Sequence, residues 1–221
     1  MQPKKKTMKK LLIFVSVMII VVIAASLSYI YYDAHSQYNG IDVSHHNNID
    51  WESVAGDPNI KFCYIKATEG INYTDPKCLD NVECAKAIGI DYGLYHYFRT
   101  GRSGIEQFRH FDALLQKSNS TLIPVVDIEA QSNSFDGPAN TDVKDFLAAF
   151  YDKYGYYPIV YYGDIFSALR TKSATDGCQY WSGILFSKYV LNTCIQQQGV
   201  RYIHNCLLDI DYCEDLEKLK Q

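Results

Sequence analysis

Eight short runs of apolar, β-branched and aromatic residues recur after residue 39, with helix-length segments or loops between them. Runs of this length and composition are typical of buried β-strands. They occupy residues 40–44, 60–68, 91–98, 121–129, 157–163, 180–187, 194–200 and 206–213. Strands that alternate with helices predict a mostly parallel sheet with helices outside it. Eight strands in roughly 180 residues therefore predict an α/β fold, an irregular and trimmed (β/α)8-like barrel, with an open α/β sheet as the alternative.

Three helices are expected between these strands. The first spans residues 74–89, where Pro76 suits a helix start and Gly89 a helix end. The second spans residues 104–118, in which large apolar residues recur at helical spacing. The third spans residues 141–155, with Thr141 as its cap and Gly155 as its stop. The gaps after the fifth to seventh strands are short, so the last helices of the barrel should be missing or reduced to turns.

The N-terminus has the pattern of a membrane anchor. Five lysines lie within residues 1–10, and no charged residue follows until Asp33. Such a stretch can cross a bilayer as a helix, with the lysines on the cytoplasmic side. We therefore expect a basic cytoplasmic segment over residues 1–10, a transmembrane signal-anchor over 11–32, a linker over 33–39 and a folded domain over 40–221. A cleavable signal peptide is the alternative, because small residues at 24–26 suit a peptidase; the domain would then be secreted.

The net charge and the cysteines of the domain bear on whether it binds nucleic acid, forms disulfides or holds a metal. Beyond residue 32 the chain carries 16 of its 21 basic residues and all 25 acidic ones, a formal net charge of −9, which argues against nucleic-acid binding. All seven cysteines follow the anchor, where an oxidising compartment would permit disulfides, and their odd number leaves at least one unpaired. Cys63 and Cys206 lie inside expected strands and could instead be small buried hydrophobes. No pair has C-x-x-C spacing, so neither a metal nor another cofactor is expected.

The run "PVVDIEA" ends in two acids, Asp127 and Glu129. Residues two apart on a strand point to the same side, so both side chains should project into one cavity, with Cα atoms roughly 6.6 Å apart. In β/α barrels the carboxyl ends of the strands build the active site. Polar residues end other runs as well: Asp42, Glu69, His96, Tyr97, Tyr161, Tyr162, Asp209 and Asp211. Several carboxylates should therefore converge on one opening.

Converging carboxylates suit the cleavage of a glycosidic bond. Crowded like charges raise the pKa of at least one acid, which keeps a proton available near neutral pH. One acid can then protonate the leaving oxygen while another group stabilises the oxocarbenium-like centre. Acids at strand ends also occur simply where apolar strands emerge into water. The joint pattern over several strands favours the catalytic interpretation.

A family resemblance rests on five motifs, "GIDVSHHNNIDW", "YIKATEG", "GLYHYF", "PVVDIE" and "PIVYYG", in this order and spacing. With them, the chain from Gly40 to about Tyr212 resembles the glycoside hydrolase family 25 lysozymes, the N-acetylmuramidases of the Chalaropsis type. The resemblance implies an irregular β/α barrel that hydrolyses the β-1,4 bond from N-acetylmuramic acid to N-acetylglucosamine in peptidoglycan.

The same resemblance implies roles for four acids. Glu129 matches the family's proton donor, and Asp127 its partner. Asp42 and Asp209 match the two other aspartates of the cleft. Asp127 would either attack the sugar as a nucleophile or orient a substrate acetamido group that attacks in its place. The D-x-E ending also resembles that of chitinases that use substrate assistance, which favours the second role.

Substrate contacts are expected from seven further residues: Glu69, Tyr64, His96, Tyr97, Tyr162, Gln196 and Asp211. Tyr95 is a further tyrosine candidate for the cleft, and Glu69 could instead pair with Lys66. The sequence departs from the family late in the chain, where Ile195-Gln196 stands in place of Trp-Gln and the segment around Trp181 aligns poorly. An aromatic platform for one sugar could therefore be missing. Adjacent His45 and His46 point opposite ways on an extended segment, which argues against a metal site.

Together these features predict a membrane-anchored, exported and monomeric muramidase that cuts peptidoglycan glycan strands close to the membrane. One alternative is a catalytically silent wall-binding module that keeps the cleft. Another is a hydrolase with the same fold that cuts a different amino-sugar polymer, such as chitin.

Overall fold

The structure, a computed structural model, describes residues 10–11, 13–24, 26, 37–99, 101–129, 140–183, 193–203 and 206–221. The chain divides into two compact units, Met1–Gln37 and Tyr38–Gln221. In the first unit, residues 13–24 are helical, and apolar side chains from Leu11 to Ile23 are 45–64% exposed. No helix among the described residues has both the length and the apolar character needed to cross a membrane. The span expected over 11–32 stays a prediction, since 12, 25 and 27–32 lie outside those residues.

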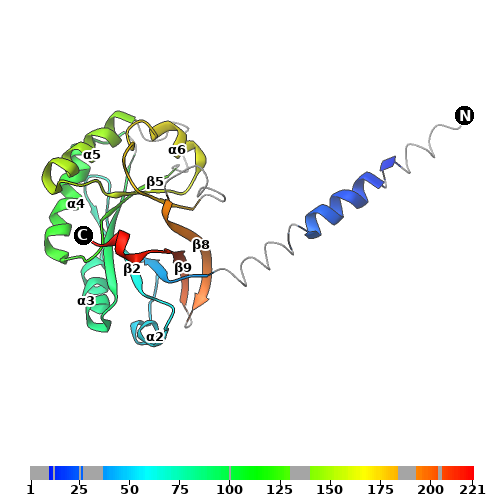
Figure 1. Cartoon of the computed structure of the whole chain (residues 1–221), viewed down its shortest axis with the longest axis horizontal. Coiled ribbons are helices and arrows are strands. Elements are labelled where there is room, and N and C mark those ends of the chain that lie inside the picture. Colours follow the sequence, from blue (N-terminus) through cyan, green and yellow to red (C-terminus); the bar gives the residue numbers. More distant parts are fainter. Residues whose placement is uncertain are drawn as a thin grey trace, which may run out of the picture. The chain divides into compact units, whose positions relative to one another are not determined.

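The second unit is built on a closed sheet (Figure 1). Its strands are β1 (Gly40–Val43), β2 (Phe62–Glu69), β3 (Tyr73–Thr74), β4 (Asp91–Tyr97), β5 (Val125–Ile128), β6 (Ile159–Tyr162), β7 (Tyr180–Ser182), β8 (Thr193–Ile203) and β9 (Cys206–Tyr212). Parallel pairing runs from β1 through β2, β4, β5, β6 and β7 to β8. β9 pairs antiparallel with both β8 and β1, and this closes the barrel. The predicted barrel-like fold is confirmed.

The reversed direction of β9 was not anticipated. Ile203 of β8 pairs with Cys206 of β9, so only two residues separate the two paired ends. An antiparallel pair can be joined by so short a connection, whereas a parallel pair needs a crossover of a dozen residues or more. The short β3, which pairs antiparallel with β2 at one edge, was also absent from the prediction.

Helices cover the outer face of the barrel (Figure 1). They are α2 (Trp51–Gly56), α3 (Cys78–Ile88), α4 (Gly104–Ser118), α5 (Asn140–Tyr154) and α6 (Ile165–Thr171). The 3₁₀ helix η2 (Leu216–Leu219) instead contributes Leu219 to the interior of the barrel. α3 ends as predicted at Gly89, whose φ of 74° lets its N–H bond back to the last turn. Thr141 is not a cap, because α5 begins one residue earlier. The short α6 agrees with the expected reduction of the late helices.

Two apolar clusters lie on the two faces of the sheet. The outer cluster joins the strands to the helices and includes Phe111, Phe146 and Phe150. The inner cluster fills the barrel with Phe62, Tyr64, Val125, Ile159 and Ile195, each fully buried. The inner cluster forms a packed floor, so the open end of the barrel is where a substrate could enter. All seven cysteines carry free thiols in the structure, and five of them are buried.

The contact between α4 and α5, which cover β4 and β5, can be tested at Gly104. A Cβ added there would lie 1.9 Å from the Asp142 carbonyl oxygen and 2.8 Å from the Phe146 backbone nitrogen. Helix propensity alone favours alanine by about 1 kcal/mol. We expect the steric clash to outweigh this gain in helix propensity, so that Gly104→Ala lowers the free energy of unfolding in urea by roughly 1–3 kcal/mol. Gly56→Ala is the control, because its Cβ meets nothing within 4 Å. Equal effects of the two substitutions would contradict this packing.

Candidate active site

One cavity of about 350 Å³ opens at the carboxyl ends of the parallel strands. Its lining combines acidic, aromatic and amide side chains from β1, β2, β4, β5, β6, β7, β8 and β9 with the segments that follow them. The lining residues are Asp42, Ser44, His46, Lys66, Tyr95, Tyr97, Val125, Asp127, Glu129, Tyr161, Trp181, Gln197 and Asp209. All four acids predicted as catalytic therefore face the same cavity. Their catalytic roles stay predictions.

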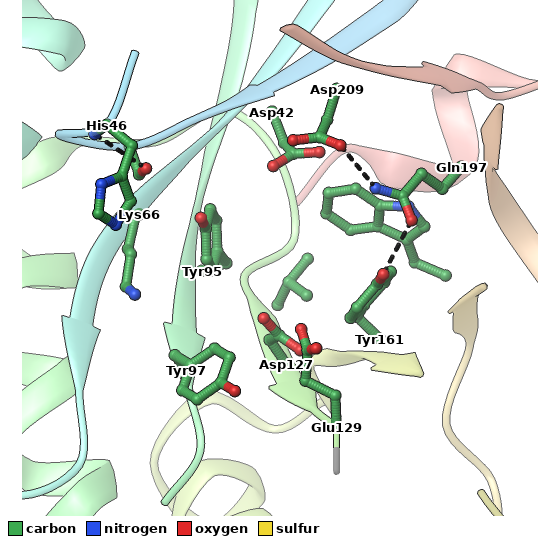
Figure 2. Close-up of a pocket in the computed structure, with 13 residues that line it drawn as sticks. Asp42, His46, Lys66, Tyr95, Tyr97, Asp127, Glu129, Tyr161, Gln197 and Asp209 are labelled. Atoms are coloured by element: carbon green, nitrogen blue, oxygen red, sulfur yellow. Dashed lines mark hydrogen bonds between the residues drawn. The ribbon is translucent and has the colours of Figure 1, made fainter. Parts of the chain in front are cut away.

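Asp42 and Asp209 form one acidic pair of this cavity (Figure 2). They are directly paired across β1 and β9, because the reversed β9 brings its middle, rather than its end, to the cavity. Asp209 accepts a hydrogen bond from Gln197 Nε2 at 3.1 Å, and Tyr161 donates to Gln197 Oε1 at 2.9 Å. Burial raises the pKa of Asp42 well above its usual range, and the charges of Asp209 and Glu129 raise it further. Burial also raises the pKa of Asp209.

Asp127 and Glu129 form the second acidic pair, and their carboxyl groups lie next to each other (Figure 2). Asp127 is 7% exposed, whereas Glu129 is half-buried. Burial raises the pKa of both acids. The hydrogen bond between them raises the pKa of Asp127 and lowers that of Glu129. The Asp127 Oδ1 atom is buried and has no hydrogen-bond partner among the described residues.

Lys66 brings a positive charge to this acidic cavity. Its Nζ lies 2.7 Å from Glu69 Oε2 and 4.9 Å from the centre of the Tyr97 ring. Glu69 also binds the Arg99 guanidinium. Burial raises the pKa of Glu69, but the hydrogen bonds from Lys66 and Arg99 outweigh it and lower the pKa overall. Lys66 in turn lowers the pKa of Asp127 and Glu129, opposing the effect of their burial.

Several residues predicted to bind substrate do not line the cavity. Glu69 holds Lys66 instead, and Tyr64 belongs to the floor, where its hydroxyl donates to the Ile123 carbonyl. His96 points to the helices: it contacts Thr68 and Gln107, stacks on Phe146, and burial lowers its pKa to about 3.

Two further candidates are displaced by one residue. Tyr162 binds Thr171 and Thr175 on the outer face, so its neighbour Tyr161 faces the cavity. On β8, Gln197 faces the cavity in place of Gln196. Of the other residues predicted for the cleft, Tyr97 and the further candidate Tyr95 are part of the cavity lining.

Several lining residues were missed from the sequence. Tyr161 could have been found by the period of two, because it pairs directly with Asp127. Trp181 in turn pairs with Tyr161, and its ring lies 5.2 Å from those of Tyr64 and Tyr161. The site therefore has an aromatic wall although the expected Trp-Gln is absent.

Asp211 lies deeper than predicted, one pleat below Asp209 and opposite Gly40. It is fully buried, and neither carboxyl oxygen is in hydrogen-bonding geometry with a described residue. Burial raises its pKa well above the usual range, and the charges of Asp42 and Asp209 raise it further. The nearby Trp181 N–H has a smaller, opposite effect. Asp211 therefore lies beneath the acidic site and supports it, rather than lining the cavity.

The raised pKa of Asp211 makes stability depend on pH. The folded protein holds this proton at pH values where the unfolded chain, with a pKa of about 3.9, has lost it. Stability from this group is therefore full below about pH 4 and is lost as pH rises through the folded-state pKa. We expect Asp211→Asn to stabilise the protein at pH 7.5, with roughly 2–4 °C in Tm for each 1 kcal/mol gained, and to lose this advantage towards pH 4.

Thermal unfolding at both pH values checks this expectation. Asp152→Asn, on the exposed side of α5, is the control and should show no such difference. An Asp211→Asn protein that is less stable than the unmodified protein at pH 7.5 would contradict a protonated Asp211.

Comparison with known proteins agrees with this architecture. Lysozyme M1 of Streptomyces globisporus is 36% identical over 126 residues, 54% of this chain and 42% of that protein. Uncharacterized protein YegX of Escherichia coli K12 is 32% identical over 133 residues, 58% of this chain and 49% of that protein. The chain thus spans about half the length of the curated relatives that it matches.

Solved structures share the fold over most of the chain. A bacterial lysozyme from Streptomyces coelicolor aligns with a TM-score of 0.67 and 26% identity, covering 82% of this chain and 94% of that one. A family 25 glycosyl hydrolase from Bacillus anthracis has a TM-score of 0.68 and 23% identity, covering 83% and 96%. The model of the glycosyl hydrolases family 25 matches residues 41–183, which is more than half of the chain. The chain therefore belongs to glycosyl hydrolase family 25.

Proposed function

We propose that this protein is a peptidoglycan hydrolase, an N-acetylmuramidase that cleaves the β-1,4 bond between N-acetylmuramic acid and N-acetylglucosamine. Family membership and the similarity to lysozymes support this activity. The observation that carries the proposal is the meeting of Asp127 and Glu129 in one cavity with Asp42 and Asp209. This arrangement supplies a protonated acid beside carboxylates that can stabilise positive charge.

Glu129 is the proposed general acid. It lines the cavity and is less buried than Asp127, and burial together with the charge of Asp164 raises its pKa. When a glycan occupies the cavity, Glu129 gives its proton to the glycosidic oxygen as the bond from that oxygen to C1 breaks. The resulting Glu129 carboxylate then takes a proton from the water that attacks C1.

Asp127 is proposed to orient the substrate. Its unpartnered Oδ1 is a buried acceptor in the cavity wall, which a substrate acetamido N–H would satisfy. This contact would direct the acetamido oxygen at C1 as the leaving group departs, giving a cyclic intermediate that water opens. The likeness of the D-x-E ending to that of chitinases that use substrate assistance supports this role over direct attack by Asp127.

Replacement of Glu129 tests the activity. We expect Glu129→Gln to slow the clearing of purified cell walls by about 10²–10⁴-fold, because the amide cannot transfer a proton. The turbidity assay uses the full chain, with Glu106→Gln on the exposed side of α4 as the matched control. Equal clearing by the Glu129→Gln and unmodified proteins would refute the assignment. Wall binding without clearing by either would instead identify a silent binding module.

The released products identify the polymer in the same experiment. Fragments from peptidoglycan should end in N-acetylmuramic acid at the reducing end, as mass spectrometry after borohydride reduction would show. Release of fragments from chitin alone would replace the proposed substrate by another amino-sugar polymer.

An exported location is proposed from the N-terminal segment. Its described helical residues expose a continuous series of apolar side chains, and five lysines precede them. This composition supports a membrane anchor with the barrel outside the cytoplasm.

Cell fractionation tests the anchor. We expect the full chain in the membrane fraction, where protease added to spheroplasts digests the barrel, and a chain without residues 1–37 in the soluble fraction. A mature protein that begins after residue 26 and is found in the medium would show that the segment is a cleaved signal peptide.

A further inference from the structure

The β8–β9 hairpin continues past the barrel. Its pairs run from Gln196 and Tyr212 to Ile203 and Cys206. Among the residues that the structure describes, β1 pairs with β9 as far as Asp209, and β7 pairs with β8 as far as Gln196. Residues 200–203 and 206–208 therefore form a two-stranded ribbon beyond these neighbours, in the long hairpin seen in Figure 1.

The two faces of this ribbon differ sharply in burial. One face packs on the outer cluster through Ile203, Cys206 and Leu208, which are 1–8% exposed. The other face carries Val200, Tyr202 and Leu207, which are 49%, 69% and 58% exposed. We call these three residues the hairpin strip. A large ring and two aliphatic side chains are thus exposed to solvent on a pair of hydrogen-bonded strands.

The hairpin strip lies on the same side of the sheet as the cavity. Val200 pairs directly with Asp209, and Tyr202 with Leu207, and directly paired residues share a face. Leu207 and Asp209 are two apart on one strand and also share a face. Since Asp209 lines the cavity, the strip continues the cavity wall outward, with the Tyr202 pair roughly 6.6 Å beyond the Asp209 pair.

A loop at the cavity rim fixes the ribbon in this position. Asn47 Nδ2 donates to the Leu207 carbonyl at 3.1 Å, and Asn47 Oδ1 accepts from the Ser44 backbone N–H at 2.8 Å. Lys77 Nζ holds the Asn47 carbonyl at 2.9 Å. Ser44 and His46 of the same loop line the cavity. The strip and the cavity wall are therefore parts of one connected surface.

We propose that the hairpin strip binds sugar units of the glycan strand that extend beyond the bond being cut. This inference rests on the proposed function and adds a binding surface outside the catalytic cavity. A pyranose ring has an apolar C–H face that stacks on an aromatic ring, and its hydroxyls can reach the polar tip of a tyrosine. Tyr202 provides such a ring, and Val200 and Leu207 extend the apolar contact towards Asp209.

The size and position of the strip favour a glycan over other ligands. Three side chains cover far less area than the roughly 800 Å² that each partner buries in a stable protein complex. A glycan strand that is already bound in the cavity would instead contact the strip without a second loss of translational and rotational freedom. Stem peptides and a membrane surface are the competing ligands, and the experiment includes both.

The experiment measures cleavage of peptide-free glycan fragments of increasing length by the full chain and its Tyr202→Ala and Leu207→Ala variants. We expect KM for the longest strands to rise about three- to tenfold with kcat unchanged, and no change for the shortest fragment that is cleaved. Tyr202→Trp should preserve the KM of the unmodified protein. Tyr151→Ala, an exposed tyrosine on α5, is the control, and Tm is measured for each variant.

Each other outcome has a separate meaning. A KM that rises equally for all lengths, or for none, overturns the glycan assignment while cleavage by the unmodified protein upholds the proposed function. An effect only on strands that carry stem peptides assigns the strip to the peptide and also overturns it. Vesicle binding is measured with the chain without residues 1–37, which lacks the proposed anchor. Loss of its sedimentation with phosphatidylglycerol vesicles on Tyr202→Ala, without a change in KM, assigns the strip to the membrane and also overturns the glycan assignment.

A binding measurement keeps the inference testable if no fragment is cleaved. In that case the proposed function fails, and co-sedimentation with long peptide-free strands is compared for the unmodified and Tyr202→Ala proteins. Weaker binding by Tyr202→Ala would retain the strip as a glycan site, and equal binding would reject it.

Discussion

The mouth of the barrel is organised by the burial of carboxyl groups close to one another. Asp42, Asp209 and Asp211 meet through the pairing of β1 with β9, and Asp127 and Glu129 share a hydrogen bond on β5. Removing several carboxylates from water costs more free energy than most single contacts return, so the site keeps protons on some of them. A chain does not tolerate this arrangement for stability alone. The cost is consistent with a site whose reaction needs a proton held near neutral pH.

The side chains around this site reduce the negative charge of the carboxyl groups only in part. Lys66 lies near the second acidic pair, but its Nζ is bound by Glu69, which also binds Arg99. The Gln197 amide donates a hydrogen bond to Asp209 and accepts one from Tyr161, so this one side chain links the β9 side of the cavity to the β6 side. Uncharged partners stabilise the geometry while the pKa values stay raised. A second cation aimed at Glu129 would lower its pKa and remove the acid that the proposed reaction needs.

Strand and helix positions follow closely from the sequence because local chemistry determines them. Gly89 ends α3 in the left-handed conformation, and the apolar run at 62–69 is buried on both faces, as such runs usually are. The direction of β9 depends instead on a connection of two residues, which composition does not reveal. The depth of Asp211 has the same origin. In a reversed strand the later residue lies further from the opening, so a rule that places late residues at the mouth fails there.

The predicted site residues are right where the alternation of side chains along a strand can be followed from a residue whose face is known. They are wrong where that alternation cannot be followed. Asp127 and Glu129 share a face because they are two residues apart on the chain. Tyr162 lies on the opposite face from Tyr161, which pairs with Asp127, and His96 lies on the opposite face from Tyr97. Each error is a shift of one residue, which in a strand moves a side chain to the opposite face. On β8 the pairing is irregular near Tyr180 and again near Gly199, so even a careful count from the sequence would lose the face. The same reversed hairpin that defeats the count brings Asp209 to the cavity and exposes Tyr202 beyond it, so the least predictable element of the fold carries both an acid of the site and the hairpin strip.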